Sequence, residues 1–259
     1  MTEYQAVVFF DLDNTLLNEQ HTVDRPVLDA LETLKENNIL PVIATGRSVA
    51  AVSDVLDLTG IDSIVAMNGQ YVEIGREPVY RRAFDIDLLN RLTDFCTARS
   101  VALAMYNAYE VWATEYTEVL KRGYASINLP APPLEPLRHR NDEVLMALAL
   151  SEDENDDVAL RAAFPELAFF RNIAFSVDIV FRDISKRTGI EHVLSSLKNP
   201  DIPTFAFGDG PNDVDMIQSV SHGIAMGNAV EETKSVAEFI TSDFREDGIV
   251  RGLQHFGLI

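Results

Sequence analysis

The stretch that decides the fold is AVVFFDLDNTL, residues 6–16. Its first half, residues 6–10, is a short apolar run of the kind that forms a strand buried on both faces of a parallel sheet. Its second half is a polar turn in which Asp11 and Asp13 stand two positions apart. Because ligands of open α/β sheets bind beyond the carboxyl ends of the strands, both carboxylates are expected at a functional edge. An acidic turn that caps a helix would need only one of them, and this segment alone does not decide between the two interpretations.

Apolar strand patterns and amphipathic helix patterns alternate along much of the remaining chain. Residues 40–44, 64–66 and 204–207 are typical of further buried strands, and helical segments separate them. Strands that alternate with helices in this way predict a parallel sheet joined by right-handed crossovers. The fold class that follows is α/β, with a Rossmann-like parallel-sheet core.

The middle of the chain departs from this rhythm. Hairpin-like and helical segments mix there, and the proline-rich stretch 130–136 cannot form regular structure. We therefore expect an inserted α+β domain of residues 82–185, and a core formed by residues 1–81 together with residues 186–259.

The composition restricts the partners that the chain can have. Its 259 residues include 41 acidic and 21 basic side chains, which gives a net charge of −20. Such a surface repels nucleic acid and anionic membranes, so we expect neither of them as a partner. It also repels an anionic substrate, so a phosphate site must supply its own positive charge locally.

The chain shows no signal for export or for membrane insertion. The N-terminus carries no basic segment, and no apolar stretch approaches the ~20 residues of a membrane span. A single cysteine, Cys96, excludes an internal disulfide and a multi-cysteine metal cluster. These features predict a cytoplasmic location, and they leave the oligomeric state, monomer or dimer, open.

A second acidic turn, Gly208-Asp-Gly-Pro-Asn-Asp213, directly follows a predicted strand. Dinucleotide binding is excluded because an aspartate there would repel phosphate and the G-x-G-x-x-G fingerprint is absent. If this strand lies beside the first one, four carboxylates meet at one sheet edge: Asp11, Asp13, Asp209 and Asp213. Each like-charged pair ~4 Å apart costs about 4 kcal/mol at an effective dielectric of ~20, so such a cluster requires a cation. Ligands that are all oxygen favour Mg²⁺.

Two weaker signals accompany the acidic turns. At Thr45-Gly46-Arg47, a hydroxyl and free backbone N–H groups at a strand end suit a phosphate oxygen, although such a sequence is commonly a plain turn. Arg47 is open to two interpretations, a substrate contact or a surface residue. Lys186 opens a predicted helix; a lone lysine is usually a surface residue, and this one gains significance only from the other motifs.

Together, the four segments resemble the four motifs of the haloacid dehalogenase superfamily in kind, order and spacing. The first motif corresponds to Asp11–Leu16, the second to Thr45, the third to Lys186 and the fourth to Gly208–Asp213. The insert between the second and third motifs resembles, in position and size, the C2 cap of the Cof-type branch. Similarity to that branch also extends to Met67-Asn-Gly69, Ala225–Ala229, Lys234 and Glu246–Gly248. The resemblance covers the core, and the cap only in its placement and general architecture.

The resemblance implies a role for each motif residue. Asp11 would be the nucleophile that forms an aspartyl-phosphate, and Asp13 the general acid and base. Mg²⁺ would be the cofactor, bound by Asp11, the backbone carbonyl of Asp13 and Asp209, with Asp213 orienting the water shell of the metal. The groups that would hold the phosphate are the Leu12 amide, Thr45, Gly46, Lys186 and Asn212.

The function that the resemblance implies is a Mg²⁺-dependent phosphomonoester hydrolase for small phosphorylated metabolites similar to sugar phosphates. A sugar phosphomutase of the same superfamily is an alternative, and a non-catalytic Mg²⁺-binding module is another. The module is disfavoured because a binder has no use for the acid–base residue Asp13. The cap would exclude water and set specificity, and Arg171 with Asn172 is expected at a cap turn that could face the site. The sequence names neither the physiological substrate nor the specificity residues.

Overall fold

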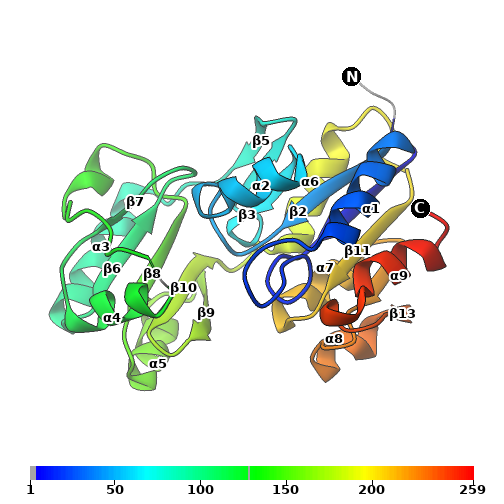
Figure 1. Ribbon diagram of the computed structural model, residues 1–259. Helices are drawn as coiled ribbons and strands as arrows, with labels where there is room; N and C mark the ends of the chain where they lie inside the picture. The colour runs from blue at the N-terminus through cyan, green and yellow to red at the C-terminus, as the bar shows by residue number, and fades with distance from the viewer. Residues whose placement is uncertain (1–3, 128) are drawn as a thin grey trace. The chain divides into compact units, whose positions relative to one another are not determined.

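The computed structural model of the protein describes residues 4–127 and 129–259 (Figure 1). It divides the chain into two compact units. The core unit comprises Met1–Tyr80 and Ile184–Ile259, and the inserted unit comprises Arg81–Asp183. These bounds differ from the sequence-based ones by one or two residues: Arg81 falls in the inserted unit, and Ile184 and Ser185 fall in the core unit, where Ser185 caps a core helix.

The core unit contains an eight-stranded sheet of order β13-β12-β11-β1-β2-β3-β4-β5. Its centre is β1 (Ala6–Phe10), which pairs in parallel with β2 (Ile39–Ala44) on one side and with β11 (Thr204–Gly208) on the other. All five residues of β1 are buried, as expected for a strand covered on both faces. The other strands of this sheet are β3 (Ile64–Ala66), β4 (Tyr71–Ile74), β5 (Glu77–Arg81), β12 (His222–Ala225) and β13 (Phe239–Ile240).

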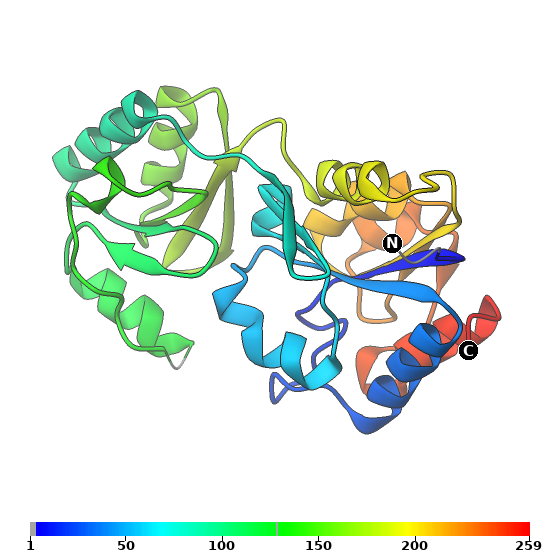
Figure 2. The same ribbon diagram turned by 90° about the horizontal axis from the view of Figure 1, so that it is seen from above.

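Helices cover both faces of this sheet (Figure 2). On one face α1 packs against α9, and on the other face α6 packs against α7. Helix α1 begins after Asp24 with a proline in its first turn, and it turns Val27, Leu31 and Leu34 into the core. The helices of the core unit are α1 (Arg25–Glu36), α2 (Ser53–Thr59), α6 (Lys186–Ser196), α7 (Val214–Ser219), α8 (Glu231–Val236) and α9 (Gly248–His255), with the short 3₁₀ segments η1 (Ala50–Val52), η2 (Met67–Gly69), η4 (Pro211–Asp213) and η5 (Phe244–Glu246).

The inserted unit is built on a five-stranded sheet of order β7-β6-β8-β10-β9. Its neighbouring strands pair antiparallel. One face carries α4, and the other carries α3 and α5, which meet through an edge contact of Phe95 with Phe164 (Figure 2). The elements are α3 (Ile86–Ala98), β6 (Ala102–Tyr106), β7 (Val111–Ala113), α4 (Glu118–Ser126), η3 (Arg138–Arg140), β8 (Met146–Leu150), α5 (Glu154–Ala163), β9 (Leu167–Ile173) and β10 (Ser176–Phe181). The α/β class with a parallel core and an α+β insert is confirmed.

The expected turn at Arg171 and Asn172 is wrong, because both residues lie within β9. The turn falls two residues later, and β9 pairs antiparallel with β10 through an irregular register. The guanidinium of Arg171 donates to both carboxylate oxygens of Asp157, at 2.9 and 2.5 Å, and to the carbonyls of Ser151 and Ala174. These contacts tie Arg171 to its own unit.

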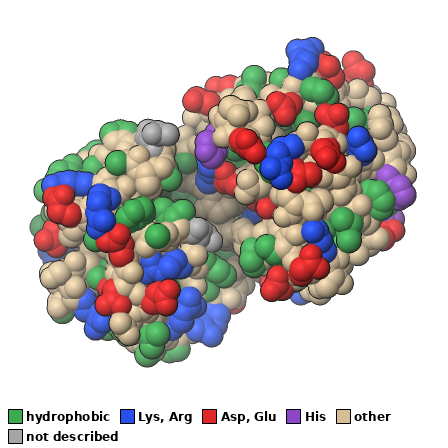
Figure 3. Space-filling model, turned by 60° about the horizontal axis from the view of Figure 1, so that its bottom comes forward, with side chains coloured by type: hydrophobic (Ala, Val, Ile, Leu, Met, Phe, Trp, Pro, Cys, Tyr) green, Lys and Arg blue, Asp and Glu red, His purple; other side chains and the backbone are tan. Residues whose placement is uncertain are grey.

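Charged side chains of both signs are interspersed over the face that Figure 3 shows. Acidic side chains lie among lysines and arginines on both units, so this face presents no single basic patch of the kind that binds nucleic acid. Among the described helices, none is both long and apolar enough to cross a membrane.

Cys96 provides a test of packing in the inserted unit. It is a buried residue of α3, and its burial lowers the reactivity of the thiol. Burial, with a smaller contribution from Asp156, raises the pKa of the Cys96 thiol to about 12. Since the thiolate is the reactive form, we expect no reaction with a thiol reagent such as dithionitrobenzoate near pH ~8 in the native protein. The same protein unfolded in guanidinium should react with one equivalent. Rapid labelling of the native protein would contradict this packing.

Candidate functional site

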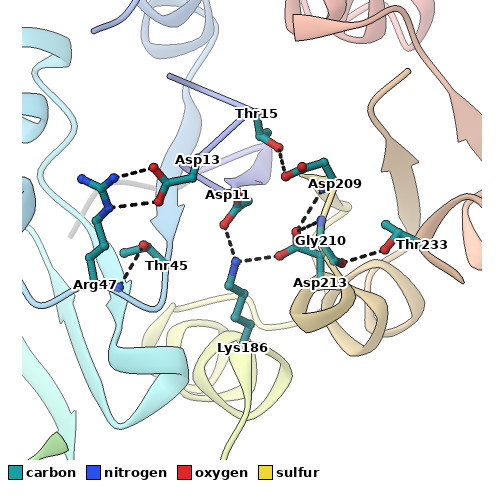
Figure 4. Close-up of polar contacts among 10 residues, drawn as sticks. All are labelled: Asp11, Asp13, Thr15, Thr45, Arg47, Lys186, Asp209, Gly210, Asp213 and Thr233. Carbon is teal, nitrogen blue, oxygen red and sulfur yellow. Dashed lines mark hydrogen bonds and ion pairs between the residues drawn. The ribbon is translucent and has the colours of Figure 1, made fainter. Parts of the chain in front are cut away.

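The candidate site lies at the carboxyl edge of the core sheet, where neighbouring parallel strands end. Asp11 follows β1 and Asp209 follows β11, and these strands pair directly. Asp213 ends the short segment η4, a few residues after Asp209. One carboxylate oxygen of each of these three residues lies within 4.8 Å of the other two. The structure thus brings together three of the four carboxylates that the sequence singled out (Figure 4).

Lys186 places a positive charge inside this acidic cluster. It is the first residue of α6, and a capping box between Ser185 and Thr188 fixes the start of that helix. Its ammonium is fully buried and donates to Oδ1 of Asp11 and, at 2.6 Å, to Oδ1 of Asp213. Lys186 is therefore not the surface residue that a lone lysine usually is.

The buried charges change one another's ionisation. Burial and the nearby Asp213 raise the pKa of Asp11 well above its usual range, against the opposing effect of Lys186. Burial and Asp213 also raise the pKa of Asp209 to about 6. Burial on its own would lower the pKa of Lys186, but Asp11 and Asp213 outweigh it and raise that pKa. The lysine is therefore charged, and it only partly offsets the repulsion among three carboxylates.

Asp213 is completely buried, and both of its oxygens are engaged by groups of the chain itself. Oδ1 accepts from Lys186, and Oδ2 accepts from the backbone N–H groups of Asp209, at 3.0 Å, and Gly210, at 2.9 Å. Gly208 permits this close approach, because a Cβ there would stand 2.6 Å from the Cβ of Asp213. The arrangement suits a carboxylate that orients its neighbours more than one that binds a cation directly.

The carboxylate of Asp13 turns away from the cluster. It accepts two hydrogen bonds from Arg47, at 2.9 Å from Nε and 2.5 Å from Nη2, and it is partly exposed (Figure 4). His21 lies 3.9 Å from it on the open side. The expected four-carboxylate cluster therefore contains three carboxylates, because a bidentate guanidinium competes for the fourth. The backbone carbonyl of Asp13 lies two residues after Asp11 in the same turn.

The residues expected to hold phosphate differ in their burial and in their position around the cluster. Thr45 is buried at the end of β2, and its hydroxyl accepts from the N–H of Arg47 at 3.1 Å. Gly46 follows it directly, and Leu12 lies in the turn between the two aspartates with its side chain buried. Asn212 is exposed in η4, and its Oδ1 lies 2.7 Å from the point where a Cβ of Gly210 would stand.

Three further polar side chains hold the edge together, and no pattern in the sequence assigned them a role. Thr15 donates to Oδ1 of Asp209 at 3.1 Å, and Thr233 donates to the carbonyl of Gly210 at 2.7 Å. Asn228 donates to the carbonyl of Asn14 at 2.9 Å and to Oδ2 of Asp209 at 3.4 Å, which links the two acidic turns. Thr15 lies inside the first motif and Asn228 inside the segment 225–229, and these positions are the only sequence feature that could have predicted a role for them.

The site has the donor set of a divalent-cation site. Asp11 and Asp209 present carboxylate oxygens close together, and the raised pKa of each reports repulsion and desolvation that a cation would relieve. All ligand atoms are oxygen, as Mg²⁺ prefers. The residues present therefore fit a divalent cation, and a carboxylate beside a buried lysine at a strand end is suited to phosphoryl chemistry.

Comparisons with known proteins agree on one family. Residues 8–253 match the family described as haloacid dehalogenase-like hydrolase. The chain is 30% identical over 255 residues to "Putative phosphatase YkrA" of Bacillus subtilis (strain 168), covering 98% of each protein. It resembles the crystal structure of a hypothetical protein from Geobacillus kaustophilus HTA426 with a TM-score of 0.92 and 33% identity, covering 98% of this chain and 99% of the other. It also resembles the subclass IIB sugar phosphatase BT4131, with a TM-score of 0.83, 28% identity and coverage of 98% and 99%.

Thermal unfolding at two pH values tests the cation site. The raised pKa of Asp209 means that its favourable contribution to the stability of the metal-free protein is complete below the unfolded value, ~3.9, and is lost as pH rises through about 6. Mg²⁺ should therefore stabilise strongly at about pH 7.5, by about 2.7 kcal/mol at a hundredfold excess over Kd, and much less at about pH 5. Asp209→Asn should remove most of the shift. Equal shifts at both pH values, or an unchanged shift in the variant, would contradict the assignment.

Proposed function

The chain belongs to the haloacid dehalogenase-like hydrolase family, and from this premise we propose that it is a Mg²⁺-dependent phosphomonoesterase for small phosphorylated metabolites. The observation that carries the proposal is the fully buried Lys186, held between Asp11 and Asp213 beside Asp209. A buried ammonium at a cluster of carboxylates suits a site where negative charge develops during phosphoryl transfer. A sugar phosphate is the leading substrate class, since a solved relative is named a sugar phosphatase.

Asp11 is the proposed nucleophile. Its carboxylate oxygen forms a bond to the substrate phosphorus while the ester oxygen leaves, and water then attacks the aspartyl-phosphate to release phosphate and restore the carboxylate. This division replaces one very slow hydrolysis by two faster steps. Its position supports the role: Asp11 lies at the end of the central strand, and Lys186 fixes its Oδ1. Attack requires the ionised carboxylate, which burial disfavours in the metal-free protein.

The proposed Mg²⁺ ligands are Asp11, the backbone carbonyl of Asp13 and Asp209, with Asp213 acting through the water shell. When bound, the cation would neutralise charge on the phosphoryl group and favour the ionised form of Asp11. The engagement of both Asp213 oxygens by Lys186 and by backbone N–H groups supports an indirect role for that residue.

Asp13 is the proposed acid and base. It would protonate the departing ester oxygen in the first step and take a proton from water in the second. In the structure its carboxylate is bound to Arg47, so this pairing must be exchanged for a contact with the substrate. Because both side chains are partly exposed, breaking this ion pair costs no more than the ~1 kcal/mol of stability that an exposed pair contributes.

The phosphate is proposed to bind the Leu12 amide, Thr45, Gly46, Lys186 and Asn212. The burial of Thr45 and the position of Lys186 support their assignments, while Asn212 rests on the family resemblance. The inserted unit is proposed to act as the cap that limits water access and selects the leaving group. The cytoplasmic location stays a prediction from the sequence.

Asp11→Asn tests the nucleophile. The amide keeps the shape of the side chain but cannot attack phosphorus, so phosphate release from a panel of phosphometabolites should fall by about four orders of magnitude or more. Asp29→Asn, an exposed carboxylate of α1, is the matched control and should hydrolyse normally. Undiminished release by the Asp11 variant would refute the assignment. Isomerised sugar phosphate without free phosphate, from the wild type, would favour the mutase.

Asp13→Asn separates the two proton transfers. With p-nitrophenyl phosphate the leaving group needs no proton, so the first step should survive while hydrolysis of the aspartyl-phosphate slows by about 10²–10⁴-fold. Rapid mixing should then show a burst of one equivalent of nitrophenolate followed by slow turnover. With an alkyl phosphate no burst is expected. A variant that turns over at the wild-type rate, or shows no burst with either ester, would rule out this role.

A further inference from the structure

A third strand end borders the candidate site and carries a polar side chain without an assigned role. Strand β3 pairs in parallel with β2, so the residue after it reaches the same edge as Thr45. The segment that follows is η2, in which Met67 and Asn68 have φ values of 52° and 54°. Left-handed backbone is costly for methionine and tolerated by asparagine, so the surrounding structure must hold this turn in place.

Backbone contacts fix η2 from two sides. On one side the N–H groups of Met67 and Asn68 donate to the carbonyls of Arg47 and Thr45, each at 3.0 Å. On the other side Gly69, with φ 103°, lies so close to helix α6 that a Cβ there would stand 2.2 Å from the Ser185 carbonyl. The turn therefore joins the Thr45–Gly46 loop to the start of the helix that carries Lys186.

The side chain of Asn68 lies at this junction, and its amide group makes no hydrogen bond to another described residue. It is 94% buried, since only 6% of its surface is exposed. Its amide lies against Gly46, with Nδ2 and Oδ1 at 3.2 and 3.3 Å from the point where a Cβ of Gly46 would stand. Within residues 4–127 and 129–259, no side chain or backbone group pairs with this amide, and Oδ1 is fully shielded. A phosphate oxygen can pair only with the Nδ2 donor, because Oδ1 is itself an acceptor. An unpaired donor on a side chain this deeply buried is costly unless a ligand accepts from it.

We propose that Asn68 is a further phosphate-binding residue, whose Nδ2 donates a hydrogen bond to an oxygen of the phosphoryl group held at Thr45 and Gly46. This inference rests on the proposed phosphatase function. Asn68 follows β3, which lies on the side of β2 away from β1 and Asp11, and it supplies a donor there without altering the charge of the cluster. The left-handed turn serves to direct the amide at the loop, and Gly46 leaves room for it.

Two substitutions separate the amide from the fold. Asn68→Gly accepts the same positive φ while removing the donor, and Asn68→Asp keeps the shape while replacing the donor by a negative charge. Asn38 has φ 56°, is exposed, and precedes β2 at the opposite end of that strand, so Asn38→Gly and Asn38→Asp are matched controls. The probe is inorganic phosphate, titrated calorimetrically into each protein saturated with Mg²⁺, with Mg²⁺ affinity measured separately.

Asn68→Gly should weaken phosphate binding by about 10- to 100-fold, as expected for a lost hydrogen bond to a charged group, and Asn68→Asp should weaken it further. Mg²⁺ affinity and the thermal midpoint should stay close to those of the matched Asn38 variant. Phosphate affinity within about twofold of the wild type would overturn the inference while leaving the proposed function intact. Parallel losses of Mg²⁺ binding and thermal stability would also overturn it, since they would indicate a structural role. A wild type that neither binds phosphate nor hydrolyses any ester would refute the proposed function itself.

Discussion

Lys186 carries a positive charge to a place that water does not reach, and much of the core is arranged to accommodate it. Its ammonium is fully buried and is held by Asp11 and Asp213. Removing one partner of a buried pair leaves an uncompensated charge and costs about 3–5 kcal/mol. Asp11 must therefore follow β1 directly, Asp213 must lie in the turn after β11, and α6 must begin with Lys186 between these two carboxylates. The parallel pairing of β1 with β11 is what allows these three requirements to be met together.

Charge balance explains why cation and phosphate binding should depend on each other. Three ionised carboxylates and one ammonium leave an excess of negative charge, which would repel a phosphate ester. The same excess of negative charge contributes to the raised pKa values of Asp11 and Asp209, because protonation of these carboxylates reduces it. A divalent cation can replace those protons, because it binds the same oxygens and brings the positive charge that the ester needs. The overall charge of −20 makes this local compensation more necessary.

The parts of the site that the sequence predicts are those set by strand ends. Asp11, Thr45 and Asp209 follow apolar runs, so the parallel topology alone brings them to one edge. Lys186 could be assigned to the site only because its position matches the third motif of the family, since a single lysine in a sequence does not indicate that it is buried. The pairing of Asp13 with Arg47 depends on side-chain rotamers, which spacing does not encode. The left-handed backbone of Met67 was equally hidden, since its residue type argues against that conformation.

The polar contacts that Figure 4 draws around the site lie within the core unit. The ten residues whose contacts Figure 4 draws belong to the segments 1–80 and 184–259, and their hydrogen bonds join the ends of β1, β2 and β11 to the start of α6. The turn η2 extends this network to β3, because the N–H groups of Met67 and Asn68 donate to the carbonyls of Arg47 and Thr45. Such a network fixes the positions of the proposed nucleophile and of the proposed phosphate donors whichever leaving group is attached. In the proposed function, discrimination among esters comes from groups beyond the phosphate, and we propose that the inserted unit supplies them, so that specificity can vary without changes to the buried charges of the core unit.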